Sequence, residues 1–339
     1  MTNRVRIIPS GHEFVSRGNS TLLDAGLGAG LALGYGCSNG NCGECLARVV
    51  SGEVIQTRHH DYVTNKEAGG NQILMCCNTA ASDVVLEAIE AQSSSEIPQQ
   101  HITARVRNIQ LVDNDIALVH LKTPRSQRLR FLAGQHVQLG VNGAASATHS
   151  VASCPCDDMN LHFNIPLVPG DPFSSHVFEA MRKGDAVEIE GPYGDFVLDE
   201  LSNRPLVFIA WRTGFGPVRS LVEHAMALDV PQDIHLVWIA ENKQGRYLDN
   251  LCRSWADALN GFHYVAIDAA PDDSSLNIET KLFDQLELGP DELPNHDFYI
   301  AGNEWLLGSC ETFILNNGVP VEQLIMDRII HPWFSSDSK

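Results

Sequence analysis

The chain has 339 residues, a length that favours two to three domains. Hydrophobic residues make up 44% and charged residues 19%, as in a packed globular protein rather than a disordered one. The formal net charge of −19 argues against a nucleic-acid-binding protein and against docking to an anionic membrane surface. No apolar run approaches the roughly 18 residues that a membrane span needs. No signal peptide is visible, so we expect a cytoplasmic protein without a membrane span.

The cysteines are unevenly distributed along the chain, because five of the nine lie before residue 92. A small, polar stretch that ends at Pro98 reads as a linker. We therefore expect a first domain over 1–92, a linker over 93–101 and a second domain over 102–202. In this setting cysteines are more often metal ligands or free thiols than disulfides.

The second and third domains differ in their periodicity. Short strand-like runs separated by Gly and Pro predict an antiparallel barrel with strands at 102–112, 116–123, 137–141, 161–166, 186–190 and 196–198 and a helix at 174–181. From residue 203 to 339, strands and helices alternate, which predicts a doubly wound parallel sheet. Its expected strands are 206–210, 234–240, 263–267 and 298–301, and its expected helices are 217–227, 247–259, 279–285 and 304–316.

The strongest motif is a glycine-rich loop with three cysteines, Cys37, Cys42 and Cys45, at the spacing C-x4-C-x2-C. This is the spacing of a plant-type [2Fe–2S] loop, which needs a distant fourth cysteine. The adjacent pair Cys76 and Cys77 offers that ligand, and one of the two must be spare. The alternative is a zinc knot, although zinc sites usually pair two short cysteine hooks.

The remaining cysteines carry weaker signals. Cys154 and Cys156 flank a proline without a partner pair, so we interpret them as two loop thiols rather than a metal hook. Cys252 and Cys310 lie in helix-like segments and read as buried small hydrophobic residues. The run from Gly26 to Gly30 looks like a nucleotide loop, but it leads into the cysteine loop rather than into a helix after a strand.

The chain resembles the NAD(P)H-dependent, flavin-containing reductases that carry an N-terminal plant-type ferredoxin domain, especially those of deoxysugar dehydrases and oxygenases. In the first domain, Leu22-Leu-Asp-Ala25 before the loop and Ser82-Asp83 after it match the family pattern, which selects Cys76 as the fourth ligand. The resemblance implies a β-grasp ferredoxin domain with a [2Fe–2S] cluster, an antiparallel barrel that binds FAD and a parallel-sheet domain that binds NAD(P)H.

In the barrel, the family's flavin motif R-x-Y-S-x-x-S corresponds to Ala147-Thr-His-Ser-Val-Ala-Ser153, where Ala replaces Arg and His replaces Tyr. Losing a charge-assisted phosphate contact would cost about 1.5–3 kcal/mol. The resemblance places Ser150 near the flavin N5 edge as the catalytic residue. The flavin-binding residues it implies are His149, Ser150, Ser153, Gly170, Ser174, Ser175 and Gly191. Ser174 and Ser175 would lie at the start of a helix whose N-terminal N–H groups face the flavin diphosphate. The C-terminal Trp333 or Phe334 could cover a face of the flavin, but a packed or frayed tail is the simpler interpretation.

In the third domain, the resemblance assigns the dinucleotide to Thr213, Gly214, Pro217 and Gly302. Trp211 and Arg212 stand where the family has small residues. Glu241 suits ribose hydroxyls, which favours NADH over NADPH, although Lys243 follows closely.

The expected cofactors fit together by electron counting. NADH releases two electrons as hydride and a [2Fe–2S] cluster accepts one, so a flavin is needed between them. The main hypothesis is thus a reductase component that serves a partner oxygenase or dehydrase. The alternative, motivated by the altered nucleotide motifs, is a degenerate reductase with little or no flavin that acts as a [2Fe–2S] carrier or binding subunit. A third option is an assembly partner that docks through its acidic third domain.

Overall fold

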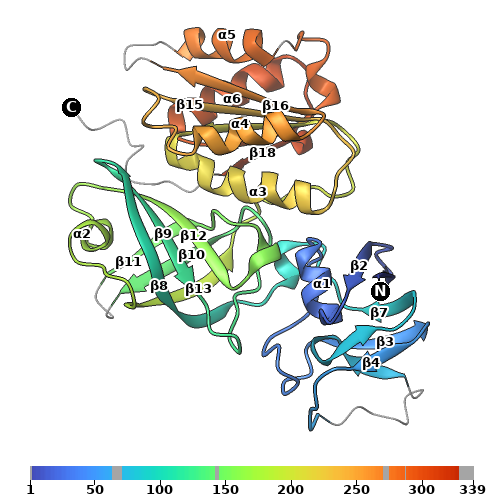
Figure 1. The fold of residues 1–339 in the computed structure, drawn as a ribbon. Coiled ribbons are helices and arrows are strands. Elements are labelled where there is room, and N and C mark those ends of the chain that lie inside the picture. Colours follow the sequence, from blue (N-terminus) through green and yellow to red (C-terminus); the bar gives the residue numbers. More distant parts are fainter. Residues whose placement is uncertain (1, 63–70, 142–144, 270–274, 287, 328–339) are drawn as a thin grey trace.

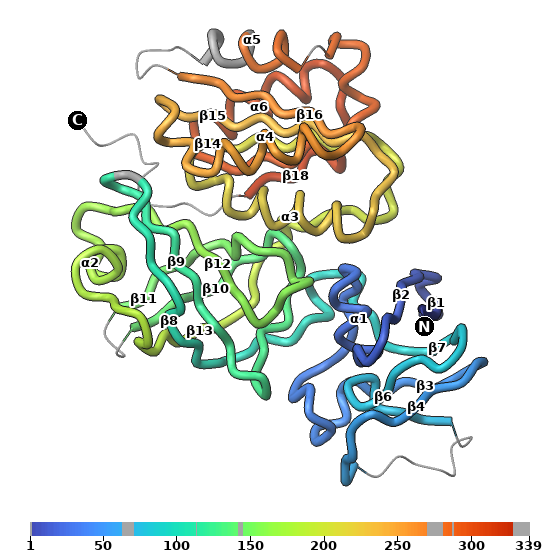
Figure 2. Tube along the Cα trace, viewed as in Figure 1, coloured from blue at the N-terminus to red at the C-terminus, as the bar shows by residue number. Residues whose placement is uncertain are grey.

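The chain folds into three units, one after another along the sequence (Figures 1 and 2). The computed structural model describes residues 2–62, 71–141, 145–269, 275–286 and 288–327. Trp333 and Phe334 lie outside the described residues. No helix in these ranges is both long and apolar enough to cross a membrane.

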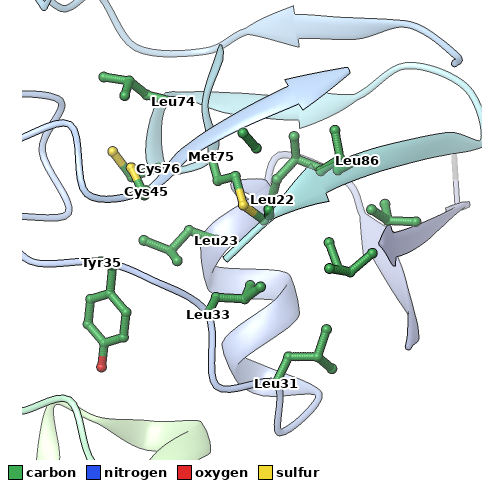
Figure 3. Close-up of a cluster of buried hydrophobic side chains, with 14 of the residues drawn as sticks. Leu22, Leu23, Leu31, Leu33, Tyr35, Cys45, Leu74, Met75, Cys76 and Leu86 are labelled. Carbon is green, nitrogen blue, oxygen red and sulfur yellow. The ribbon is translucent and has the colours of Figure 1, made fainter. Parts of the chain in front are cut away.

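The first unit is a five-stranded mixed sheet crossed by one helix. Its strand order is β2-β1-β7-β3-β5, and β1 runs parallel to β7. The strands are β1 (Thr2–Ile8), β2 (Glu13–Arg17), β3 (Leu46–Ser51), β5 (Gln72–Leu74) and β7 (Val84–Ala88), with β4 (Val54–Gln56) and β6 (Asn78–Ala80) as a separate ladder. Helix α1 (Leu22–Gly28) is capped by Thr21 and buries Leu22 and Leu23 in the core (Figure 3). This is the expected β-grasp arrangement.

The second unit is an antiparallel sheet of six strands in the order β11-β10-β13-β8-β9-β12. They are β8 (Gln100–Asp113), β9 (Ile116–Lys122), β10 (His136–Val141), β11 (Ala145–Ser150), β12 (Asn160–Pro166) and β13 (Ala186–Tyr193). The sheet curls, because the N–H of Ala152 just after β11 donates to the C=O of His162 in β12 at 2.8 Å. The predicted barrel is therefore confirmed.

Two details of the barrel differ from the sequence expectations. Strand β11 was not expected, because Ala-Ser-Ala-Thr-His-Ser contains one β-branched residue and no large apolar one. The strand expected over 196–198 is wrong: this segment forms no ladder, and Phe196 packs into the core of the third unit. Helix α2 (Pro172–Glu179) lies where a helix was predicted.

The third unit is a parallel sheet in the order β16-β15-β14-β17-β18, which confirms the doubly wound expectation. Its strands are β14 (Leu206–Trp211), β15 (Ile234–Ala240), β16 (Phe262–Asp268), β17 (Asp297–Ala301) and the unexpected β18 (Leu324–Asp327). Alternating residues of the sheet face different helices. Phe208 and Ala210 pack toward α3 (Phe215–Ala227) and α4 (Asp249–Ala258), whereas Val207 and Ile209 pack toward α5 (Ser275–Leu286) and α6 (Glu304–Asn316).

The three units touch one another. A Cβ on Gly30, whose φ is +89°, would come within 3.1 Å of the Leu228 side chain just after α3. The glycines near 30 thus let the first unit approach the third closely, which agrees with rejecting a nucleotide loop there. The predicted linker is packed rather than free, because Ile97 is buried with Ala91 and Leu132.

Candidate functional site

The cysteine loop folds tightly between α1 and β3 because glycines occupy its crowded positions. Gly40 and Gly43 have φ values of +91° and +83°. A Cβ on Gly43 would lie 2.3 Å from the Tyr62 ring, and one on Gly40 would lie 2.9 Å from the Cys77 Sγ. The turn directs the N–H groups of Asn41 and Cys42 at the Cys37 Sγ, each at 3.3 Å.

The four predicted ligands come together as two pairs. Cys37 and Cys42 form the outer pair, with the N–H of Cys37 3.3 Å from the Cys42 Sγ. Cys45 and Cys76 form the inner pair, side by side and buried (Figure 3). In the described part of the chain, no three His, Cys, Asp or Glu side chains surround one metal position. Two pairs of thiols suit two irons, whereas a zinc knot needs four ligands around one ion.

The titration of these thiols follows their surroundings. Burial raises the pKa of the Cys37 thiol, but N–H groups of Asn39, Cys42 and Asn41 lower it more, so its pKa is about 7. A hydrogen bond with Cys76, together with burial, raises the pKa of Cys45 well above its usual range. Cys76 is thus the cysteine that forms a hydrogen bond with Cys45. These thiols and the glycine cradle fit a [2Fe–2S] cluster.

Cys77 has a different environment from Cys76. Its Sγ lies 3.6 Å from the Cys76 Sγ and beneath Gly40. Burial raises the pKa of the Cys77 thiol. We interpret it as a packing residue under the loop.

The cluster loop and the barrel face a common cleft of about 770 Å³. Ser38 and Asn39 line it from the loop, and Arg125, Cys156 and Met159 line it from the barrel. Beside the cleft, the buried Tyr35 hydroxyl donates to the C=O of Leu129 at 3.4 Å. The guanidinium of Arg128 pairs with Asp24 of α1 at 3.4 Å and with Asp158 at 3.3 Å. Polar contacts thus hold the first unit against the barrel.

The altered flavin motif lies on β11 and the turn after it. His149 is buried, and its ring centroid lies 5.4 Å from that of Phe173 in α2. The Ser150 hydroxyl donates to the Asp327 carboxylate at the end of β18, at 3.2 Å. The Ser153 hydroxyl accepts from the N–H of His162 at 3.2 Å. Ser150 therefore stands at the junction of the barrel and the third unit, which suits a residue at the flavin ring.

The segment predicted to face the flavin diphosphate is occupied by its own cap. Asp171 caps α2 and accepts from the Ser174 N–H at 2.7 Å. The Ser174 hydroxyl is buried and accepts from the N–H of Val168 at 3.0 Å. Gly170, with φ +81°, precedes the cap, and Ser175 is half-buried in the first turn. The carboxylate disfavours a diphosphate there.

Gly191 lies apart from this helix. It begins a cis peptide bond with Pro192, and a Cβ on it would lie 3.0 Å from the Val137 side chain. Its role is visible as close packing of β13 on β10. Taken with Ala147, these contacts mean that the barrel residues fit a flavin better at the ring end than at the diphosphate end.

The residues predicted for the dinucleotide meet at the carboxyl edge of the parallel sheet, where such sheets bind ligands. Thr213 and Gly214 form a turn after β14, and Pro217 lies in the first turn of α3. A Cβ on Gly214 would lie 2.3 Å from the C=O oxygen of Ala301. Gly302 is just as restricted, because its Cβ would lie 2.8 Å from that of Trp211. Both glycines keep the two loops close together.

Arg212 is held by two carboxylates. It pairs with Asp115 of the barrel at 2.6 Å and with Glu241, directly after β15, at 3.2 Å. Burial lowers the pKa of Arg212, but Glu241 and Asp115 raise it more, so the net shift is upward. The guanidinium thus joins two domains rather than standing ready for a phosphate. Trp211 is buried against the ring edge of Trp305, 5.9 Å away between centroids.

Two residues at the site were not predicted from the sequence, and neither was the capping role of Asn303. Asp115 follows a turn signal that indicated only a hairpin, and Asp327 ends a strand too short to recognise. Asn303 replaces the family's proline, and its side chain caps α6 by accepting from the Leu306 N–H at 2.9 Å. An Asn followed by a helical apolar pattern was the available signal for this cap.

Comparison with known families divides the chain in three. Residues 5–82 match the 2Fe-2S iron-sulfur cluster binding domain, residues 103–198 the oxidoreductase FAD-binding domain and residues 208–311 the oxidoreductase NAD-binding domain.

Relatives cover nearly the whole chain. The CDP-6-deoxy-L-threo-D-glycero-4-hexulose-3-dehydrase reductase of Yersinia pseudotuberculosis is 31% identical over 332 residues, covering 97% of this chain and 99% of the relative. A reductase component of terephthalate 1,2-dioxygenase from a Comamonas species is 28% identical, covering 96% and 97%. Among solved structures, a cytochrome P450 reductase of Amycolatopsis has the same fold with a TM-score of 0.61 and 23% identity, covering 96% and 98%.

Proposed function

The chain belongs to the family of ferredoxin-linked FAD and NAD(P)H reductases, and from this premise we propose that it passes electrons from NADH to a partner oxygenase or dehydrase. One observation carries the proposal most directly. Four thiols stand in two pairs, three of them on the loop and the fourth at Cys76, and this loop shares a cleft with the barrel segment following the flavin motif. Bound FAD would supply the conversion from a two-electron donor to a one-electron acceptor.

The chain's own residues have distinct tasks in this proposal. Cys37, Cys42, Cys45 and Cys76 hold the cluster, and loop N–H groups stabilise the sulfur charge. Asp327 orients the Ser150 hydroxyl at the edge of the flavin ring. His149 occupies the family's tyrosine position beside it, and Ser153 fixes the turn that follows. Because the motif contains Ala147 and Asp171 lies at the diphosphate end, we expect FAD to be held more weakly than in relatives with the arginine.

For the nucleotide, Thr213, Gly214, Pro217 and Gly302 would shape the pyrophosphate site at the sheet edge. Glu241 directly follows β15, and its carboxylate would accept from ribose hydroxyls and repel a 2′-phosphate. We therefore propose NADH as the preferred donor. Comparing kcat/KM for NADH and NADPH in the wild type and in Glu241→Gln tests this: the preference for NADH should fall in the variant.

The domain limits and the location of the protein complete the proposal. We assign residues 1–92 to the ferredoxin domain, 93–101 to the linker, 102–202 to the FAD domain and 203–339 to the NAD(P)H domain. A cytoplasmic location is supported by a cluster that requires reduced thiols.

The test is anaerobic titration of the purified holoprotein with NADH, followed by its visible spectrum. A reductase should bleach at both flavin and cluster wavelengths. The alternative, a flavin-poor [2Fe–2S] carrier, is favoured by Asp171 and Ala147 at the diphosphate end. It predicts a cluster spectrum that NADH leaves unchanged and that dithionite bleaches.

A further inference from the structure

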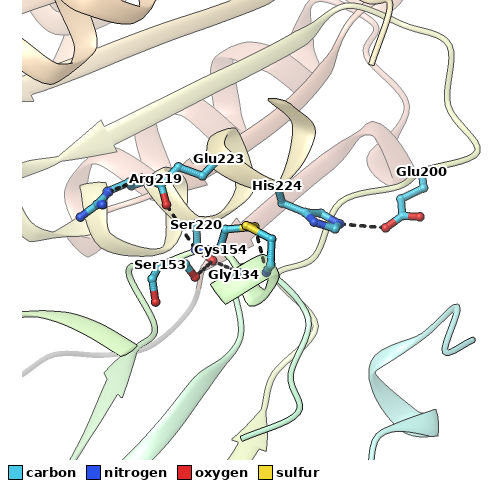
Figure 4. The surroundings of a disulfide bond; sticks show 9 residues. Gly134, Ser153, Cys154, Glu200, Arg219, Ser220, Glu223 and His224 are labelled. Atoms are coloured by element: carbon cyan, nitrogen blue, oxygen red, sulfur yellow. Dashed lines mark hydrogen bonds and ion pairs between the residues drawn. A yellow bond between two sulfur atoms is a disulfide. The ribbon is translucent and has the colours of Figure 1, made fainter. Parts of the chain in front are cut away.

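A disulfide lies at the meeting point of all three domains (Figure 4). It joins Cys154 to Cys156 across the short turn η4 (Pro155–Asp157), directly after the flavin motif. This corrects the expectation of two loop thiols. The turn contacts α1 of the ferredoxin domain and α3 of the NAD(P)H domain. One small loop of the barrel therefore touches both of its neighbours.

Side chains of helix α3 form hydrogen bonds with backbone groups of this loop. The Glu223 carboxylate accepts from the Cys154 N–H at 3.2 Å, and the Ser220 hydroxyl donates to the C=O of Ser153 at 2.7 Å. Arg219 fixes the carboxylate by donating to Glu223 at 2.7 Å (Figure 4). The position of α3 on the barrel thus depends on the conformation of the chain at residues 153–154.

The other side of the turn opens to the cleft shared with the cluster loop. Cys156, Asp157 and Asp158 line this cleft, opposite Ser38 and Asn39. Cys156 is half-buried, whereas Cys154 is only 3% exposed. Cys156 is therefore the more accessible of the two cysteines, and it is the one that lines the cleft.

Stability does not explain this disulfide. The stabilisation from a crosslink grows with the length of the loop that it closes. The loop closed by this disulfide is very short, because the two cysteines have a sequence separation of only 2. In a reducing compartment, disulfides are usually transient, catalytic or redox-sensing.

We propose that Cys154 and Cys156 form a thiol-responsive redox site that controls electron delivery from the flavin domain to the cluster. A thiolate of an external dithiol attacks the Cys156 Sγ, the bond between the two protein sulfurs breaks, and Cys154 leaves as a thiolate that takes up a proton. The second thiol of the reagent then releases Cys156 as a thiol and leaves the reagent as a disulfide. Two electrons pass from the dithiol to the protein, and an oxidised dithiol reverses the reaction.

Once the bond is broken, the turn that contacts both α1 and α3 is no longer fixed by its internal crosslink, so the cluster domain is held less closely to the barrel. The effect on electron delivery rests on the proposed reductase function, whereas the presence of the disulfide does not. Two experiments keep these claims separate.

The first experiment counts thiols by mass spectrometry after denaturation, cluster removal and alkylation. Without prior reduction the wild type should carry seven labels, and after reduction nine, the full number of cysteines. Cys156→Ser should carry the same number of labels with and without reduction. Nine labels on the unreduced wild type, purified without thiols, would overturn the proposal whatever the protein's activity.

The second experiment compares two NADH-driven rates in the holoprotein, before and after dithiol treatment and anaerobic desalting. Cytochrome c reports electrons that leave through the cluster, and ferricyanide reports those that leave the flavin. Reduction should slow the first rate by at least about threefold and leave the second unchanged. Cys156→Ser should be slow without treatment and insensitive to it, whereas Cys252→Ala should respond like the wild type.

The outcomes are distinguishable. Seven labels with equal cytochrome c rates before and after reduction would overturn the control of electron delivery. A protein that reduces neither acceptor with NADH, with or without dithiol, would contradict the proposed reductase function. Partial slowing of both rates would place the effect at the flavin or nucleotide site, and would also overturn the proposal.

Discussion

Replacing Arg212 by alanine separates a structural role from a phosphate-binding role. In the structure its guanidinium pairs with Asp115 across the domain boundary and with Glu241 within the nucleotide domain. If these pairs are its purpose, Arg212→Ala destabilises the packing of the two domains and leaves nucleotide binding nearly unchanged. If Arg212 instead serves the pyrophosphate, the variant loses affinity for NADH and keeps its stability.

The size of the effect follows from burial. The Arg212 side chain is 17% exposed, and those of Asp115 and Glu241 are 26% and 33% exposed. An exposed ion pair contributes about 0–1 kcal/mol, whereas removing one partner of a buried pair costs about 3–5 kcal/mol. This cluster lies between the two limits, so we expect a loss of about 2 kcal/mol. For a chain of this length that corresponds to a fall in Tm of about 3 °C.

The assay combines a thermal melt with steady-state kinetics. We expect the fall in Tm together with a change in the KM for NADH of less than about threefold. Asp115→Asn should lower the Tm in the same way, and the double variant should lose little more, because both changes break one contact. A KM that rises more than about tenfold at an unchanged Tm would refute the structural role, since that is the loss expected for a charge-assisted phosphate contact.

Three further outcomes follow from the geometry. Cys76→Ala should abolish the visible absorption of the cluster while Cys77→Ala keeps it; the reverse result would move the fourth ligand to Cys77. Asn303→Ala should lower the free energy of unfolding by about 1 kcal/mol in urea titration, since it removes the cap of α6, and an unchanged midpoint would contradict the cap. Burial, with the neighbouring His263 and His296, lowers the pKa of His235 to about 4. Between pH 6.5 and 4 only the unfolded chain binds this proton. The free energy of unfolding therefore decreases as the pH is lowered, by about 1 kcal/mol per pH unit. His235→Gln should reduce this slope, and an unaltered slope would exclude the histidine as its source.

The sequence was sufficient for the architecture where local pattern and chemistry agree. The third domain alternates strands and helices, and the buried run of β15 is bounded as expected because polar turns flank it. The spacing of Cys37, Cys42 and Cys45 likewise predicted a cluster loop, because few other arrangements need glycines between thiols at those positions.

The remaining features depend on contacts between distant segments. Strand β11 forms because β10 pairs with it along its whole length, although its own residues have little strand preference. Arg212 pairs with Asp115, which belongs to the barrel. Ser150 donates to Asp327, which lies in the last described strand. Cys154 and Cys156 were predicted to be free thiols because the local sequence does not show how the turn brings the two sulfurs together.

As a reductase, this chain has to hold both a flavin and a [2Fe–2S] cluster for NADH-driven electron transfer. The most direct measurement is the flavin released by acid from freshly purified protein, with FAD resolved from FMN, set against its iron content. We expect one FAD for every two irons, restored by incubation with FAD where weak binding at the altered motif has lost it. Two irons without flavin, even after incubation with FAD, would contradict it and leave a [2Fe–2S] carrier that takes its electrons from an external donor.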